Sequence, residues 1–377
     1  MPSSGLLHFD RFSGTHEAIE MKRLPLAGMM LAFFLLLLLA VSVRQALLFV
    51  VGIGMGAALA GARFGFTTGW RQLIEHKDPR GVTGQIALLS LAALLAMPLL
   101  ANYTELTAAL GPPSVSLIVG AFVFGLTMQI ADGCGSGTLY KAGLGIPLNM
   151  GILPLFAAGS FLGSVHMGDW LSLGHSEPVG LVNTLGLEKA LAVTMLGLLL
   201  ALIAVRLWVG KDRAWFDGKW LWGALALALL ATLNLIIAGQ PWGVVYGFGL
   251  WAAKIAQSAN LFDPTGNFFW GQEGNAQILA QTVLLDVTSI TNIGILAGAL
   301  WISAKASGNA TPMTRQQWMI GLAAGFLMGY SSRLAFGCNI GAMLSGVSTG
   351  SLHGWIWIPL AFAGTWFGVK VRRHYGF

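Results

Sequence analysis

The stretch ADGCGSGTLYKAGLG, residues 131–145, contains five glycines and one of the two cysteines in the chain. It directly follows an apolar run, residues 115–131, that approaches the length needed to cross a membrane. Glycines at the end of such a run predict a helix that breaks inside the protein. The free backbone groups of a broken helix are costly in a membrane unless they line a cavity or are buried in protein.

The composition of the whole chain places it in a membrane. Its 377 residues are 55% hydrophobic and 10% charged, with a mean hydropathy of +0.72, whereas soluble domains carry about 25% charged residues. The first long apolar run, residues 24–43, is long enough to span a bilayer, and we interpret it as a retained helix. We therefore expect an all-α polytopic membrane protein with about nine crossings. The further apolar runs cover residues 46–66, 82–101, 115–131, 148–164, 187–209, 221–238, 242–258, 276–303, 318–336 and 352–369.

Lysine and arginine are distributed unevenly among the loops. The loops 102–114, 166–186 and 259–275 contain none of either. Cytoplasmic loops of membrane proteins carry an excess of these residues, so the pattern explains the net charge of +6 without a nucleic-acid partner. It also predicts that both termini lie on the cytoplasmic side. Most of the lysines and arginines lie in residues 1–23, 63–80, 206–219, 305–315 and 370–373.

Two parts of the sequence repeat each other. VFGLTMQIADGCGSGTLY (residues 123–140) and AGFLMGYSSRLAFGCNIGAML (residues 324–344) share a G-C-x-x-G frame, which places Cys134 and Cys338 204 residues apart. A glycine precedes each cysteine by nine residues. Upstream, DPRG and DPTG repeat at an offset of 185 residues. The difference between the offsets predicts an insertion in the second half, around residues 267–275 and in a longer helix after them.

The loop charges predict that the two repeats are inverted. The basic loop 63–80 corresponds to loop 259–275, which has no lysine or arginine, and loop 102–114 corresponds to the basic loop 305–315. Inverted repeats with broken helices that meet near the midplane are typical of transporters. This topology requires residues 219–258 to make a single net crossing, with a break at GQPWG. The predicted units are an N-terminal tail and extra helix (1–45), a first repeat (46–185), connecting helices (186–229) and a second repeat (230–377).

Both cysteines are expected to project into the space between the broken helices. Glycines permit a sharp turn and close approach of a ligand there, and N–H groups at the start of the next half-helix favour an anion. A single buried cysteine is usually a small hydrophobic residue, but two in matching frames favour a functional pair. We predict a substrate path formed by Cys134, Cys338, Gly133, Gly135, Gly137, Gly337, Asn339, Gly341, Arg333 and Lys254.

Arg333 lies five residues before the second cysteine, at the end of an apolar run. An arginine inside the membrane marks a functional site by default, although a position at the membrane interface is the alternative. Gln129 occupies the same position in the first repeat. The two ends of the path are therefore predicted to differ in charge.

Structural roles are open to two further charged residues. Lys254 could face the path or form an ion pair with Asp286. Asp132 precedes the first cysteine by two residues and is expected to pair with Lys141 and fix the turn.

The motifs DGCGSGTLY, FGCNIGAML and GQPWGVVYGFGLWAAK resemble the YeeE/YedE family of bacterial inner-membrane sulfur transporters, over most of the chain after about Ala46. The resemblance implies an hourglass of inverted halves and uptake of thiosulfate or a related sulfur compound. It also implies path cysteines at Cys134 and Cys338, and a cytoplasmic TusA-type sulfurtransferase as a partner besides membrane lipids. Many members carry a third cysteine in an RFCFT-like segment. This chain has Gly65 there, so a relay of three thiols is in doubt.

Other classes of function are less compatible with the sequence. The histidines have no ligand spacing, and no nucleotide-binding or hydrolase motif occurs, so we expect no metal, no cofactor and no enzyme. Buried thiols are expected to stay protonated and to donate weak hydrogen bonds to a sulfur anion. The alternatives are a membrane redox protein that handles thiols or persulfides, a partner of another membrane complex, and a transporter of sulfite, sulfide or a selenium species.

Overall fold

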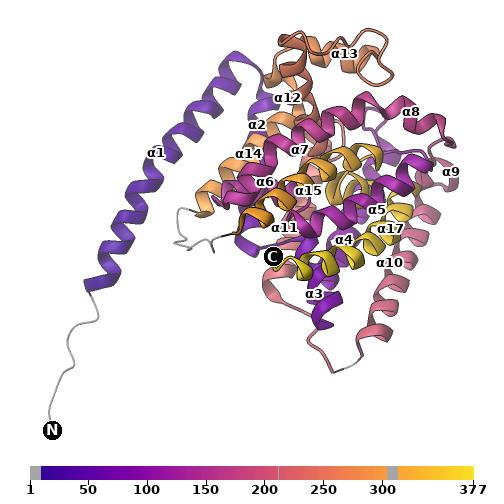
Figure 1. Ribbon diagram of the computed structural model, residues 1–377, viewed down its shortest axis with the longest axis horizontal. Helices are drawn as coiled ribbons and strands as arrows, with labels where there is room; N and C mark the ends of the chain where they lie inside the picture. Colours follow the sequence, from indigo (N-terminus) through magenta and orange to yellow (C-terminus); the bar gives the residue numbers. More distant parts are fainter. Residues whose placement is uncertain (1–9, 211, 304–312) are drawn as a thin grey trace.

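The structure is a computed structural model that describes residues 10–210, 212–303 and 313–377, with side chains from Arg23 onward. The described residues form helices and no β-strand; two isolated bridges, Ser114 with His175 and Gly180 with Ser351, are the only extended pairings among them. Part of the basic loop 305–315 lies outside the described residues. The helices, drawn in Figure 1, are α1 (Asp10–Ala40), α2 (Val43–Ala62), α3 (Phe66–His76), α4 (Arg80–Asn102), α5 (Val115–Ile130), α6 (Gly135–Gly143), α7 (Pro147–Val165), α8 (Met167–Ser172), α9 (Leu181–Leu185), α10 (Leu187–Val209), α11 (Gly218–Ala238), α12 (Val245–Ser258), α13 (Glu273–Ala280), η1 (Val283–Leu285), α14 (Val287–Ser303), α15 (Arg315–Leu334), η2 (Asn339–Ser345), α16 (Gly346–Ser348) and α17 (Leu352–His374).

Eight helical segments among the described residues are long and apolar enough to cross a membrane, and α14 is a shorter apolar helix. This confirms the prediction of an all-α polytopic membrane protein. The number of crossings stays a prediction. The eight segments are Arg23–Ala40, Val43–His76, Arg80–Asn102, Val115–Gly143, Pro147–Val165, Leu187–Val209, Gly218–Ala238 and Arg315–Ser348.

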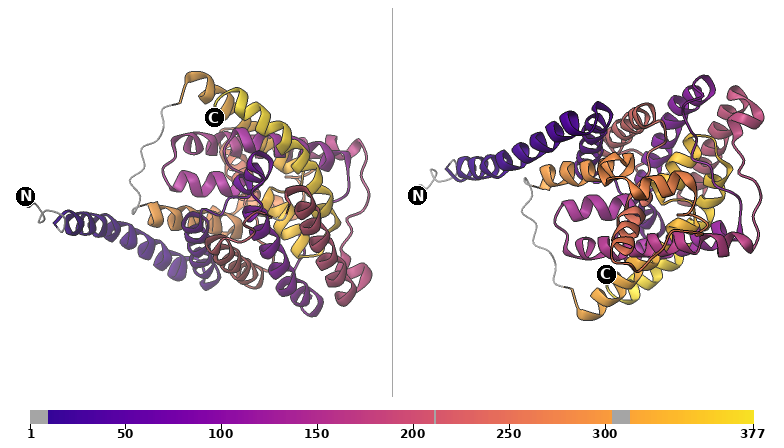
Figure 2. Two further views of the ribbon diagram at one scale, coloured as in Figure 1. Left: turned by 90° about the horizontal axis from the view of Figure 1, so that it is seen from below. Right: turned by 90° about the horizontal axis from the view of Figure 1, so that it is seen from above.

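Helix α1 lies on the outside of the body and packs mainly against α2. Figures 1 and 2 show it projecting from the body, which it meets near α2. Phe33 packs edge-on against Phe49 of α2, with 4.9 Å between the ring centroids. Leu24 and Leu39 expose 77% and 82% of their surface, which suits a helix whose sides contact lipid. The assignment of residues 1–45 to a separate unit stays a prediction.

The helices of the body pack in matching pairs. Helix α7 packs along α15 and α5 along α17, while α2 packs along α14 and α4 along α11. Gly125 of α5 meets the backbone of Ala361, and Gly329 of α15 meets the backbone of Phe156, so neither position has space for a Cβ atom. Gly125 and Gly329 are the glycines that lie nine residues before the two cysteines, and both allow close helix crossings. The pairing is consistent with the repeat, and the inverted orientation in the membrane stays a prediction.

The segment around the predicted insertion differs in one respect from expectation. The run 276–303 was expected to form one longer helix, and this is wrong: α13 ends at Ala280, a 3₁₀ turn follows, and α14 begins at Val287. Asp286 causes the new start, because its carboxylate accepts hydrogen bonds from the N–H of Ser289 at 2.7 Å and from its hydroxyl at 2.5 Å. GQPWG does interrupt the chain, between α11 and α12.

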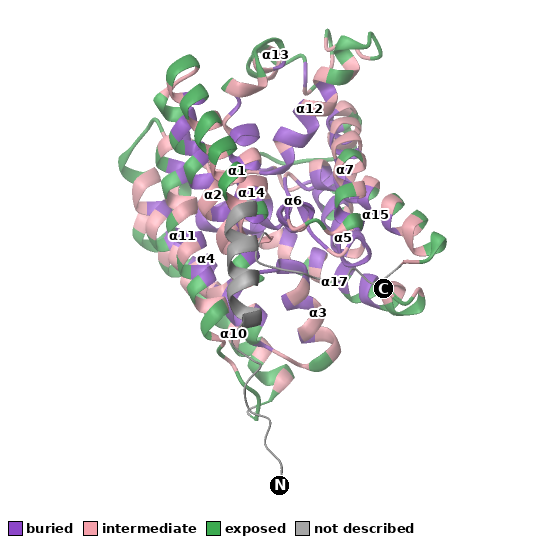
Figure 3. Ribbon diagram, turned by 90° about the vertical axis from the view of Figure 1, so that its left-hand side faces the viewer, coloured by how far each residue is buried: buried purple, intermediate pink, exposed green. Residues whose placement is uncertain are grey.

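Buried residues gather in the middle of the body, around α5 and α6, as Figure 3 shows. The outer helix α10 has only three buried residues among its 23. The core therefore surrounds the broken segments that carry the cysteines.

Candidate substrate path

The first cysteine lies at a break between two helices. Helix α5 ends at Ile130, Asp132 adopts a left-handed backbone with φ 51°, and Cys134 is the N-cap residue of α6. The N–H of Gly137 donates to the sulfur of Cys134 at 3.4 Å, and the hydroxyl of Ser136 lies 3.5 Å from it. The thiol is therefore fixed at the start of the second helix, where it takes the place of a capping hydroxyl.

The second cysteine has the same local structure. Helix α15 ends at Leu334, Phe336 adopts a left-handed backbone with φ 57°, and Cys338 precedes the π-helical turn η2. The N–H of Ile340 donates to the sulfur of Cys338 at 3.4 Å. Both cysteines are free thiols and expose no more than 1% of their surface. The sequence repeat thus produces two equivalent thiol-capped breaks.

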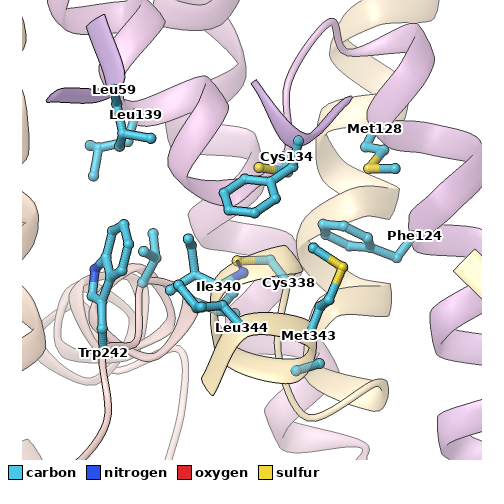
Figure 4. Close-up of a cluster of buried hydrophobic side chains, with 14 of the residues drawn as sticks. Leu59, Phe124, Met128, Cys134, Leu139, Trp242, Cys338, Ile340, Met343 and Leu344 are labelled. Atoms are coloured by element: carbon cyan, nitrogen blue, oxygen red, sulfur yellow. Dashed lines mark hydrogen bonds between the residues drawn. The ribbon is translucent and has the colours of Figure 1, made fainter. Parts of the chain in front are cut away.

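The structure brings the two breaks together in the core. A Cβ atom added to Gly135 would lie 3.0 Å from the sulfur of Cys338, so the turn after Cys134 packs directly on the second thiol. Figure 4 shows both cysteines in one cluster with Phe124, Met128 and Met343. Glycine at position 135 is needed for this close approach, because any side chain would displace the thiol.

A cavity of about 960 Å³ reaches this cluster from one side. Its inner end includes Gly341 and Ser345, in the turn that follows Cys338. Trp242 lines it as well, and its indole N–H has no acceptor among the described residues. The mouth is formed by residues of three loops, among them Thr107, Leu171 and Phe268. The cavity therefore connects the surface with the turn that follows the second cysteine.

Arg333 faces this cavity without a carboxylate partner among the described residues. Its Nε donates to the hydroxyl of Ser164 at 2.8 Å. The guanidinium carbon lies 4.5 Å from the ring centroid of Phe269 and 5.8 Å from that of Tyr246. Aromatic rings stabilise a cation without neutralising it, so a positive charge is available to an anion in the cavity.

Lys254 neither lines the cavity nor forms the ion pair with Asp286, the two roles considered from the sequence. Its ammonium group donates to the carbonyl oxygens of Ile278 at 3.1 Å and Leu279 at 2.6 Å, and also to that of Gln281. It therefore caps the C-terminal end of α13. No ion pair joins it to Asp286 in the part of the chain that the structure describes, and it does not line the cavity. Its role in the path stays a prediction that these contacts do not support.

On the other side of the cluster, the space beyond Cys134 is closed. A pocket lined by Phe64, Gly65, Tyr140 and Lys141 reaches Cys134 but is too narrow to hold a water molecule. Gly65, where the resemblance expects a third cysteine, thus lies beside the first thiol. The cavity thus reaches the turn that follows Cys338, whereas the pocket beside Cys134 has no space for a water molecule.

Asp132 lies behind this closed pocket, and its predicted pair with Lys141 is present. The ammonium lies 2.6 Å from one carboxylate oxygen, while Arg71 and Arg372 lie 2.9 and 3.2 Å from the other. The sequence analysis missed both arginines, because they come from α3 and α17, far away in the chain. No local pattern marks them.

Several polar atoms around the cysteines have no partner among the described residues. Asn339 is completely buried, and both polar atoms of its amide lack a hydrogen bond. Gln129, the counterpart of Arg333, donates to the carbonyl of Thr67 at 3.2 Å, while its own oxygen is unpaired. Buried polar groups without partners are rare in proteins, and here they surround a predicted route for a polar solute. The remaining predicted path residues, Gly133, Gly137, Gly337 and Gly341, belong to the two turns that hold the cysteines.

Comparison with known proteins points to one family. A family model described as Sulphur transport matches residues 61–367. The thiosulfate transporter TsuA of Spirochaeta thermophila is 28% identical over 340 residues, which cover 84% of this chain and 95% of the relative. TsuA of Escherichia coli is 23% identical over 349 residues, which cover 84% of this chain and 91% of the relative. The probable transporter YedE of Escherichia coli is 26% identical over 175 residues, which cover 43% of this chain and 40% of the relative.

Proposed function

Because this chain belongs to the Sulphur transport family, we propose that it takes up thiosulfate through a central path lined by Cys134 and Cys338. Transport of a sulfur compound by a multi-pass membrane protein follows from the family and from the apolar helices. The choice of thiosulfate rests on the names of the full-length relatives.

The observation that carries the two-thiol path is the position of the cysteines. The breaks α5–α6 and α15–η2 each hold a free thiol and pack on each other, and a cavity and a closed pocket adjoin them. A purely structural pair of cysteines would not require broken helices, since an unbroken helix buries a thiol at lower cost. In the proposed route, a solute that moves from the cavity to the far side passes both sulfur atoms.

The proposed mechanism replaces the hydration shell of the anion in steps. Thiosulfate enters the cavity, where the guanidinium of Arg333 offsets its charge. Each thiol already accepts a backbone N–H, from Gly137 or Ile340, so its S–H hydrogen is free to point at the anion. The terminal sulfur of thiosulfate accepts first from Cys338 and then from Cys134. Weak donors suit conduction, because tight binding at any one site would prevent release.

No covalent step is part of this proposal. The thiols act as neutral donors, the anion leaves chemically unchanged, and the protein acts as a transporter rather than an enzyme. The persulfide alternative would require a sulfur atom to move onto a cysteine. It predicts that, after exposure to substrate, one cysteine no longer reacts as a free thiol with thiol-modifying reagents.

The proposed setting is the inner membrane of a bacterium, with both termini in the cytoplasm. The loops without lysine or arginine, 102–114, 166–186 and 259–275, supply residues to the cavity mouth, which supports an external mouth. The anion would then reach the cytoplasm past Cys134. A TusA-type sulfurtransferase there is proposed as its acceptor, on the resemblance alone.

The test is uptake of radiolabelled thiosulfate by cells that lack their own thiosulfate transporters and express this protein. We expect wild type to accumulate label and Cys134→Ala and Cys338→Ala to lose most of it at equal membrane abundance. Thr194→Ala is the matched control, because Thr194 is also completely buried and unpaired but lies on the peripheral helix α10. Full uptake in both cysteine variants would overturn the two-thiol path. No uptake by wild type would overturn thiosulfate as the substrate.

A further inference from the structure

Four charged side chains form one cluster immediately behind the turn of Cys134. The carboxylate of Asp132 lies 2.9 Å from Arg71, 3.2 Å from Arg372 and 2.6 Å from Lys141. Lys141 also donates to the backbone carbonyl of Asp132. The cluster joins α3, α6 and α17 to the turn, and so connects elements from both halves of the chain.

The cluster carries more positive charge than its structural role requires. Three cations on one carboxylate leave a net charge of +2. The four side chains are mostly shielded from solvent, with exposed fractions of 17% for Arg71, 13% for Lys141, 15% for Arg372 and 26% for Asp132. One cation would suffice to pair with the carboxylate and hold the turn. Glu75 is the nearest further carboxylate, and it is already paired with Arg373. Shielded positive charges in excess of their counter-ions are costly, so this excess favours a further anion.

The position of the cluster places that anion on the predicted route. Lys141 and Cys134 line the same closed pocket, on the side opposite the cavity. A solute released by Cys134 in that direction meets the ammonium of Lys141 next. Lys141 is also the member of the cluster that contacts both the pocket and Asp132.

The cluster has no counterpart at the other end of the path. The repeat places Phe336 where the first half has Asp132, and Ser345 where it has Lys141. Phe336 shares the left-handed backbone of Asp132, with φ 57° against 51°, so the turns match and only the charges differ.

We propose that Arg71, Lys141 and Arg372 form a second anion site at the exit of the path, with Asp132 as its resident counter-ion. A small divalent oxyanion neutralises the net charge of +2 when it arrives and replaces the carboxylate as partner of Lys141. When Asp132 binds the lysine again, it displaces the anion toward the cytoplasm. The inference rests on the proposed function, because it needs an anion that passes Cys134.

Asp132→Asn tests this site in vesicles that contain the purified protein. The amide removes the competing charge, so the anion is held longer at the exit and its release becomes slower. When release limits transport, the maximal rate and the half-saturating concentration fall by the same factor. Uptake at low concentration is then unchanged. For Asp132→Asn we expect the maximal rate and the half-saturating concentration to fall severalfold. The matched control is Glu75→Gln, which makes the same charge change at an ion pair with Arg373 on the same helices α3 and α17.

The structural alternative gives a different result. If Asp132 only fixes the turn, Asp132→Asn lowers uptake equally at all concentrations, in proportion to folded protein, with an unchanged half-saturating concentration. That outcome would overturn the exit site and leave the proposed function intact.

Failure of wild type to transport thiosulfate would instead overturn the proposed function, and binding would then decide the inference. Sulfate should raise the melting temperature of Asp132→Asn more than that of Glu75→Gln, each measured against sodium chloride at equal ionic strength. Equal effects of sulfate on the two variants would overturn the exit site.

Discussion

At the scale of single residues, the account depends on charges and thiols that line one route. The cysteines and Arg333 could be selected from the sequence, because the repeat marks the cysteines and an apolar context marks the arginine. Arg71 and Arg372 could not, since their role comes from long-range contacts to Asp132. Lys254 looked equally suitable in the sequence, yet the carbonyl oxygens at the end of α13 hold it. Burial of a charge and a partner nearby in the sequence can be predicted, but partners far away in the chain cannot.

Arg333→Gln should weaken uptake through the apparent affinity. Removal of one unit charge beside a partly hydrated dianion is worth up to a few kcal/mol, so we expect the half-saturating concentration to rise by about tenfold or more. Arg333→Lys should recover part of the loss, because it restores the charge but not the hydrogen bond to Ser164. Concentration-dependent uptake is the measurement. Arg206→Gln, on the peripheral helix α10, should match wild type, and an equal loss there would contradict the local role.

Gly65→Leu should block uptake, whereas Gly65→Cys should preserve it. The pocket beside Cys134 already has no space for a water molecule, so a leucine side chain there would displace its walls and prevent it from opening. Gly65 has an extended backbone, with φ −113°, that any residue can adopt, and the closest atom to an added Cβ is the hydroxyl of Thr68 at 2.9 Å. The control is Gly61→Leu on α2, where an added Cβ meets nothing within 4 Å. Normal uptake by Gly65→Leu would show that the route avoids this pocket.

At the scale of helices, the breaks and crossings define the site. The sequence predicted that α5 and α15 end just before the cysteines, because the glycines and the repeat mark these ends. It did not predict that residues 276–303 divide into α13 and α14, since the N-cap at Asp286 has no signal beyond a single acidic residue in an apolar run. Periodicity and length predict apolar helices well, but a break made by one capping residue is hidden in them.

Gly125→Val and Gly329→Val should destabilise the protein by similar amounts. Each glycine faces the backbone of a partner helix, Ala361 on α17 or Phe156 on α7, so a branched side chain would force the pair apart. Overpacking of this kind costs about 1–3 kcal/mol. Thermal unfolding of the purified protein, followed by the loss of monodisperse material, is the measurement. Gly28→Val on α1, where an added Cβ meets nothing within 4 Å, should have little effect. A large difference between the first two variants would contradict the matched pairing.

At the scale of the whole molecule, the cavity and the loop charges indicate which face is external. Membrane class, helical fold and family could all be predicted, because composition and motifs carry them. The cavity could not, since it depends on how distant loops meet around its mouth. These loops are the ones that lack lysine and arginine, so charge distribution and shape agree on one orientation.

Labelling of introduced cysteines tests this orientation. Thr107→Cys, at the cavity mouth, should react with a membrane-impermeant maleimide in intact cells. Lys219→Cys, at the exposed start of α11, should react only after the cells are permeabilised. Wild type serves as the control, because its two thiols are buried and should not react. The opposite pattern of labelling would invert the proposed direction of transport.

The most direct test of the central claim is uptake of radiolabelled thiosulfate by vesicles that contain only this protein. The account predicts saturable uptake by wild type that unlabelled thiosulfate competes away. It predicts loss of that uptake when both Cys134 and Cys338 are changed to alanine, with the folded protein unchanged in amount. Equal uptake with and without the two thiols would contradict the two-thiol path. An absence of uptake by vesicles that contain only the wild-type protein would contradict thiosulfate transport.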